Sequence, residues 1–249
     1  MEIDRVLISS SDENSNRDEF FKLYQKNPLP PNEQLSNMGL FTKRQDLTKQ
    51  LFFNEIYKEL INTHGVIMEF GTRWGQNLVT LNNLRGIHEP YNHSRRIIGF
   101  DTFEGFISVD EKDGKHEMIK NGSYSVTDNY EKYLIDVLKY HENECPLSHI
   151  NKNTILKGDA SIELVKYLEN HPETIISFAY FDLDIYEPTI KCLELIKPHL
   201  TRGSIIGFDE LCDPNFPGET IALKEVFGTN KFQIKRNKFS GIQSYCIFE

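Results

Sequence analysis

Short apolar runs alternate with helix-like segments along most of the chain after residue 64. Five runs have the length of buried strands: Val66–Phe70, Arg96–Phe100, Thr154–Lys157, Ile175–Phe181 and Ser204–Phe208. Helical patterns follow over about residues 77–84, 161–169 and 220–227, and another begins near Pro188, a residue suited to a first helical turn. Two final strands are expected at Phe232–Lys235 and Ser244–Phe248. The alternation predicts an α/β fold, with a mainly parallel sheet covered by helices on both faces.

The first 64 residues have a different pattern. Residues 1–39 are polar and contain Pro28, Pro30 and Pro31, which predicts a loosely ordered arm with one short helix. From Leu40 to Ile61, apolar residues recur at helical spacing, and we expect an amphipathic helix that packs on the core. The predicted organisation is therefore an N-terminal region, 1–64, and a core, 65–249.

A polar segment of unusual length, residues 106–130, follows the second predicted strand. Loops this long inside a compact domain are uncommon unless they are functional or disordered. Ligands of parallel sheets bind at the carboxyl ends of the strands, and this segment starts at such an end. We therefore expect it to form a lid or a substrate loop.

Composition excludes several classes of protein. The 249 residues are 39% apolar, enough for a sizeable core, and the net charge of -9 argues against nucleic-acid binding. The longest apolar run is too short to cross a membrane, and the N-terminus lacks the pattern of a signal peptide. The four cysteines show no paired spacing, so we expect free thiols, no zinc site and a cytoplasmic location.

The first candidate binding motif is the turn from Glu69 to Gly75, between a strand and a helix. Gly71 and Gly75 allow a sharp turn and close approach of a ligand to the helix N-terminus. The spacing is not that of the dinucleotide-binding fingerprint, which disfavours a dehydrogenase. Alone, the motif is equally consistent with an ordinary strand–helix turn.

Acidic residues end the next two strands. Asp101 is placed to accept hydrogen bonds from ribose hydroxyls, and Phe103 to pack on a base or a methionine chain. Asp159 suits the recognition of an adenine amino group. The simpler interpretations are a solvated Asp101 and an Asp159 that caps the following helix.

Four more acids follow the two strongest strands: Asp182 and Asp184, then Asp209 and Glu210. Consecutive strands of a parallel sheet are often neighbours, so these carboxylates are expected to converge. Clustered carboxylates repel one another, and a hard cation such as Mg²⁺ relieves that repulsion. The alternative is that some of them cap helices or pair with Lys and Arg.

Taken in order, five motifs resemble the class I S-adenosylmethionine-dependent methyltransferases, and more closely the macrocin O-methyltransferase family of sugar O-methyltransferases. They are E-x-G-x-x-x-G, F-D-T-F-E-G-F, K-G-D-A, Y-F-D-L-D-I-Y-E-P-T and I-I-G-F-D-E-L. The resemblance covers about residues 40–249. It implies a Rossmann-like seven-stranded sheet with an antiparallel last strand, bound S-adenosylmethionine and a homo-oligomer.

The resemblance also implies the site residues. Cofactor-binding residues would be Glu69, Gly71, Arg73, Trp74, Gly75, Asn77, Asp101, Thr102, Phe103, Gly158, Asp159 and Ala160. Mg²⁺ would lie on Asp182, Asp209 and Glu210. Many relatives have Asp at the last of these positions, so the longer Glu210 is a departure that shifts its carboxylate or inserts a water.

The expected reaction is methyl transfer to a hydroxyl of a sugar or a glycosylated small molecule. Alignment of acceptor oxygen, methyl carbon and sulfur is the main task of such an enzyme. Mg²⁺ lowers the pKa of the hydroxyl, and a base removes its proton. Asp184 and His116 are the main candidates for this base, and His149 is a third.

Two other functions fit parts of the sequence. Asp182-Leu-Asp184 resembles the D-x-D motif of Mg²⁺-dependent phosphohydrolases, whose first Asp is a nucleophile. That motif belongs near the start of its domain, whereas three predicted strands precede it here. A non-catalytic relative that binds only a nucleotide is the second alternative, and the full set of acids argues against it.

Overall fold

The computed structural model describes residues 9–248 and divides the chain into two compact units, one up to Leu47 and one from Thr48 onward. The sequence placed this division near residue 64. The helix α3 (Arg44–Leu60) contains the boundary, so most of this predicted amphipathic helix belongs to the second unit.

The first unit is more helical than predicted. It contains α1 (Ser11–Gln25), α2 (Pro31–Ser36) and the short 3₁₀ helix η1 (Met38–Phe41). Ser10 and Glu13 form a reciprocal capping box at the start of α1, and the rings of Tyr24 and Phe41 pack 5.0 Å apart. The prediction of a single short helix is wrong, because local capping and a proline at the start of α2 suffice for two.

The second unit is built on a seven-stranded sheet in the order β3-β2-β1-β4-β5-β7-β6. The strands are β1 (Val66–Phe70), β2 (Ile97–Asp101), β3 (Asn153–Lys157), β4 (Ile176–Phe181), β5 (Leu200–Phe208), β6 (Lys235–Arg236) and β7 (Ser244–Ile247). The first five are parallel, and β7 runs antiparallel to β5 and β6. This confirms the expected Rossmann-like, mostly parallel fold.

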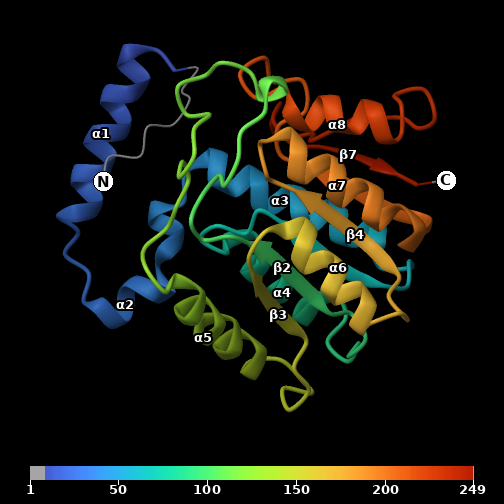
Figure 1. The fold of residues 1–249 in the computed structure, drawn as a ribbon. Helices are drawn as coiled ribbons and strands as arrows, with labels where there is room; N and C mark the ends of the chain where they lie inside the picture. Colours follow the sequence, from blue (N-terminus) through green and yellow to red (C-terminus); the bar gives the residue numbers. More distant parts are fainter. Residues whose placement is uncertain (1–8, 249) are drawn as a thin grey trace. The chain divides into compact units, whose positions relative to one another are not determined.

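Helices cover both faces of this sheet (Figure 1). On one face lie α3, α4 (Gln76–His88) and α5 (Tyr130–Asn143), which share a buried cluster with Ile67, Phe178 and Tyr180. On the other lie α6 (Ala160–Asn170), α7 (Tyr186–Ile196) and α8 (Gly218–Val226), packed on Phe70 and Phe181. The 3₁₀ helix η3 (Lys197–His199) leads from α7 into β5.

The long polar segment between β2 and α5 contains one short 3₁₀ helix, η2 (Glu111–Asp113). Asp113 is buried and anchors it, because its carboxylate accepts hydrogen bonds from the backbone N–H groups of Tyr186 (2.5 Å) and Asp110 (2.7 Å). The segment is thus tied to the start of α7. The sequence pattern did not predict α5, which follows this segment directly.

Candidate active site

The register of the sheet gathers the acidic residues at one edge. Phe70 of β1 pairs with Phe181 of β4, and Phe181 pairs with Phe208 of β5. Asp182 and Asp209, the residues that follow β4 and β5, therefore leave neighbouring strands at the same level. The expected adjacency of these two strands is confirmed.

Asp182 and Asp209 converge on a single cation, the side-chain ammonium group of Lys49. Lys49 Nζ lies 3.2 Å from Asp182 Oδ2 and 3.1 Å from Asp209 Oδ1. Asp209 Oδ1 also accepts hydrogen bonds from the Tyr180 hydroxyl at 2.6 Å and from Gln243 Nε2 at 2.9 Å. The sequence analysis missed Lys49, although a signal existed: Lys49 precedes Phe52 by three residues and Phe53 by four, which puts it on the buried face of α3.

The pKa values at this edge reflect burial and mutual repulsion. Burial and the charge of Asp209 raise the pKa of Asp182 to about 6. Burial and the charges of Asp184 and Asp209 raise the pKa of Glu210 to about 10. Burial acts in the same sense on Asp209, but Lys49 and the hydrogen bonds from Tyr180 and Gln243 outweigh it and lower the pKa of Asp209. Lys49 carries a single positive charge, so it cannot neutralise all the carboxyl groups at this edge of the sheet.

Asp184 lies in a strained turn held by a glutamate that the sequence analysis did not single out. Its φ is +62°, in the left-handed region that non-glycine residues rarely adopt. Glu219, buried in the first turn of α8, accepts hydrogen bonds at Oε1 from the backbone N–H groups of Leu183 (3.0 Å) and Asp184 (3.4 Å). Burial, and then the charges of Asp182 and Asp209, raises the pKa of Asp184 well above its ordinary value. Asp184 is therefore a carboxyl group with high affinity for a proton.

The acids suit a cation, although the described residues include no cluster of three or more His, Cys, Asp or Glu side chains arranged to hold a metal. Lys49 acts as a stand-in ion that marks where two of the predicted ligands, Asp182 and Asp209, meet. Glu210 is the third, and its Oε2 is buried without a hydrogen-bond partner among residues 9–248. Carboxylate oxygens are the ligands that Mg²⁺ prefers, so these side chains have suitable chemistry, and a metal ion here stays a prediction.

Glu69 lies in the interior beside this edge, on β1. Both of its carboxylate oxygens are buried and lack a hydrogen-bond partner in the described part of the chain. Burial raises the pKa of Glu69 well above its ordinary value, and the nearby amide of Asn77 offsets part of the rise. An unpaired buried carboxyl is costly, and a ligand with a cationic group would relieve that cost.

Gly71 and Asn77 connect the β1–α4 turn to Asp182. A Cβ atom on Gly71 would lie 1.9 Å from the carbonyl oxygen of Asp182, and the φ of +92° is in the left-handed region, so only glycine fits. Asn77 Nδ2 lies 3.5 Å from Asp182 Oδ2. The glycine is thus required by close packing of two strand ends, whether or not a ligand binds there.

Asp101 joins two neighbouring turns. Its Oδ2 accepts a hydrogen bond from the backbone N–H of Arg73, and its Oδ1 accepts one from the backbone N–H of Phe103, both at 2.6 Å. Burial raises the pKa of Asp101, and these two hydrogen bonds offset part of the rise. The carboxylate is therefore fixed by the backbone, not freely solvated.

The remaining predicted cofactor residues lie at the ends of β2 and β3. The Thr102 hydroxyl donates to the carbonyl of Gly105 at 2.8 Å, and the Phe103 ring is buried in the cluster that contains α5 residues. Asp159 caps α6 by accepting from the backbone N–H groups of Ser161 (2.8 Å) and Ile162 (3.3 Å). Gly158 and the buried Ala160 flank it. The capping interpretation of Asp159 is thus confirmed, and its contact with adenine stays a prediction.

Tyr130 and Tyr124 pack against two residues of the β1–α4 turn, Trp74 and Arg73. The ring of Trp74 packs edge-on against that of Tyr130, 4.7 Å away, and the guanidinium of Arg73 lies 4.9 Å from the centre of the Tyr124 ring. Trp74, Gly75 and Tyr130 line a groove of about 540 Å³ between α4 and α5. Tyr124 was not predicted, and its contact with Arg73 ties the polar segment 106–130 to the turn.

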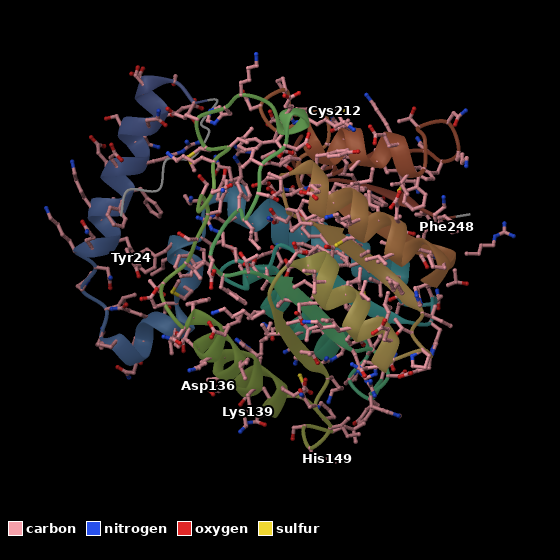
Figure 2. The ribbon with its side chains drawn as sticks, in the orientation of Figure 1. Tyr24, Asp136, Lys139, His149, Cys212 and Phe248 are labelled. Carbon is pink, nitrogen blue, oxygen red and sulfur yellow. The ribbon has the colours of Figure 1, made fainter. Side chains whose placement is uncertain are left out.

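The two histidine candidates lie in different places. His116 lies in the polar segment 106–130, where its ring packs 5.7 Å from that of Phe216 and its Nδ1 accepts a hydrogen bond from the backbone N–H of Met118 at 3.2 Å. His149 lies in the loop that precedes β3, at the opposite end of the sheet from the acids (Figure 2). This position removes His149 from consideration as a base.

Comparison with solved structures identifies close relatives. The crystal structure of CalS11, a calicheamicin methyltransferase, matches with a TM-score of 0.94 and 37% identity over 100% of this chain and 97% of that one. The apo structure of CalS11, described as a TDP-rhamnose 3'-O-methyltransferase, matches with a TM-score of 0.85 and 36% identity over 97% and 96%. The O-methyltransferase NovP shares the fold, with a TM-score of 0.57 and 16% identity over 80% of this chain and 79% of that one. No protein-family model matches the sequence, and the search of curated proteins found no match.

The sheet order, the acidic edge and these matches together define a class: the protein is an S-adenosylmethionine-dependent methyltransferase. Identity above one third along the whole chain then gives the family. The chain belongs to the O-methyltransferase family that includes CalS11. The phosphohydrolase and non-catalytic alternatives are left without support. Among residues 9–248, no helix has the length and apolar character needed to cross a membrane.

Proposed function

We propose that this protein methylates a hydroxyl of a sugar, carried by a nucleotide or a glycosylated small molecule, with help from Mg²⁺. The observation that carries the proposal is the convergence of Asp182 and Asp209 on the ammonium group of Lys49. This group lies beside the buried carboxyl of Glu69, whose oxygens have no hydrogen-bond partner among the described residues. The acceptor class comes from CalS11, which acts on TDP-rhamnose. S-adenosylmethionine would supply an already activated methyl group.

The residues at this edge have separate roles in the proposed reaction. Glu69 would bind the amino group of the methionine end of the cofactor, and Asp101 the ribose. Asp182 and Asp209, with Glu210, would hold Mg²⁺, which when bound lowers the pKa of an acceptor hydroxyl. Asp184, in its ionised form, would accept the proton of that hydroxyl, and Glu219 holds the turn that positions it.

The function is tested by ligand binding and turnover. S-adenosylhomocysteine should raise the melting temperature and NAD should not, because only a ligand of the folded state stabilises it. With Mg²⁺ and S-adenosylmethionine, TDP-rhamnose should gain one methyl group, as detected by mass spectrometry, and free rhamnose serves as the comparison. Absence of stabilisation by S-adenosylhomocysteine, with and without Mg²⁺, would refute the proposed cofactor site.

Cofactor binding should release a proton from Glu69. In the free protein, burial raises the pKa of Glu69 well above its ordinary value, which favours the protonated form. A bound ammonium group favours the carboxylate and lowers this pKa. The affinity for S-adenosylhomocysteine should therefore increase as the pH rises, and calorimetry in buffers of different ionisation enthalpy measures the released proton.

Glu69→Gln is the matched control for this proton release. The amide has nearly the same shape but no proton to lose, so binding to the variant should be weaker and should release fewer protons. Equal proton release by the variant and the wild type would show that another group titrates.

A further inference from the structure

Lys49 is the residue of the acidic edge with no role in the proposed chemistry. Its ammonium group bridges Asp182 Oδ2 and Asp209 Oδ1, at 3.2 and 3.1 Å. About a quarter of its side chain, 26%, is exposed, compared with 23% for Asp182 and 13% for Asp209. The ammonium group of Lys49, which pairs with both carboxylates, is therefore partly desolvated.

The position of Lys49 is set by the packing of α3 and not by a chance surface contact. Phe52 and Phe53, on the same helix, are buried, and the Phe53 ring packs 4.9 Å from that of Tyr180. Lys49 Nζ itself lies 5.9 Å from the centre of the Tyr180 ring. The helix therefore delivers the ammonium group to the ends of β4 and β5.

Lys49 competes for oxygens that a metal would need. Asp209 Oδ1 already accepts from Lys49, Tyr180 and Gln243. An oxygen that already accepts from three donors is a poor ligand for a divalent ion, and the loss of Lys49 would make it a better one. A metal ion and an ammonium group beside these two oxygens would repel each other, because both are cations.

We propose that Lys49 is the built-in counter-cation of the metal-free enzyme, and that a divalent ion enters by displacing its ammonium group from Asp182 and Asp209. The inference rests on the proposed function, because it takes these two acids as metal ligands. Lys49 keeps the carboxylates together when no metal is present, and it sets how tightly a metal binds. Either the ammonium group of Lys49 or the divalent ion therefore lies beside the two carboxylates at all times.

The test is direct measurement of Mn²⁺ binding, by the electron paramagnetic resonance signal of the free ion, without substrate or turnover. Lys49→Met removes the charge and leaves an unbranched side chain that is one atom shorter, so the variant should bind Mn²⁺ at least about tenfold more tightly than the wild type. Lys49→Gln should also bind more tightly than wild type, by a smaller factor, because its amide still donates a hydrogen bond. Mn²⁺ should raise the melting temperature of Lys49→Met more than that of the wild type.

Lys58→Met is the matched control, because Lys58 lies on the same helix and pairs with Glu55 at the surface. This variant should bind Mn²⁺ as the wild type does. Equal or weaker Mn²⁺ binding by both Lys49 variants, or no Mn²⁺ binding by any protein, would overturn the exchange. Binding of S-adenosylhomocysteine is measured on the same samples: its absence from the wild type contradicts the proposed function, whereas its presence with unchanged Mn²⁺ affinity contradicts only the role of Lys49.

Discussion

Replacing Asp182 by asparagine should lower the rate of methyl transfer by about 10²- to 10⁴-fold, the range for loss of a catalytic proton-transfer or metal-ligand group. The substitution keeps the shape of the side chain but removes one of the two carboxylates that meet Lys49. Affinity for S-adenosylhomocysteine should stay nearly unchanged, since Glu69 and Asp101 are intact. Single-turnover kinetics with saturating cofactor measures the rate, and calorimetry measures the affinity.

Asp136→Asn is the control for this substitution. Asp136 lies on the exposed face of α5, as Lys139 does, and the same chemical change there should leave the rate unaltered (Figure 2). Treatment of the wild type with a chelator should cause a loss similar to that of Asp182→Asn. Full activity in the chelator would exclude the metal, and a rate close to wild type for the variant would exclude Asp182.

Asp101→Ala should weaken the binding of S-adenosylhomocysteine by about 1–3 kcal/mol, the cost of losing hydrogen bonds to a charged acceptor. The structure adds a second consequence to the loss of the ribose contact. The backbone N–H groups of Arg73 and Phe103 lose their acceptor, so the β1–α4 turn should also loosen. Calorimetry gives the affinity, and hydrogen exchange at the Arg73 amide reports the turn.

Asp159→Ala separates the two effects, because Asp159 caps α6 and has no contact with the β1–α4 turn in the described hydrogen bonds. Exchange at the Arg73 amide should be unchanged in this variant. An unaltered dissociation constant for Asp101→Ala would remove Asp101 from the cofactor site, and unaltered exchange at Arg73 would show that other contacts hold the turn.

The candidate site could be predicted as far as strand ends could be located. Asp182 and Asp209 were predicted to meet because each follows a strongly apolar strand, and consecutive parallel strands tend to be neighbours. Their adjacency is what the register shows. Lys49 and Glu219 could not be paired with these acids in the same way. Both residues lie on helices. Which side chains of a helix point toward a strand end depends on how the helix packs on the sheet, and the local sequence does not determine that packing.

The polar segment 106–130 was also predicted only in part. Its length and polarity predicted a long connection after β2, and the structure has one. The helix α5 that follows was missed, although Leu134, Ile135, Val137 and Leu138 recur at helical spacing and two of them, Leu134 and Leu138, are buried. Asp113 gave no sign of being an anchor, since its partner, the Tyr186 amide, is far away in the sequence.

The sequence by itself determined the alternation of strands and helices, the acids at the strand ends and the glycine that β1 requires, because these depend on short-range periodicity and backbone sterics. Only the tertiary structure decided which charges meet. The pairing of Lys49 with Asp182 and Asp209, and of Glu219 with the Asp184 turn, joins residues distant in the chain. Such contacts are fixed by how helices pack on the sheet, and that packing is a property of the whole core.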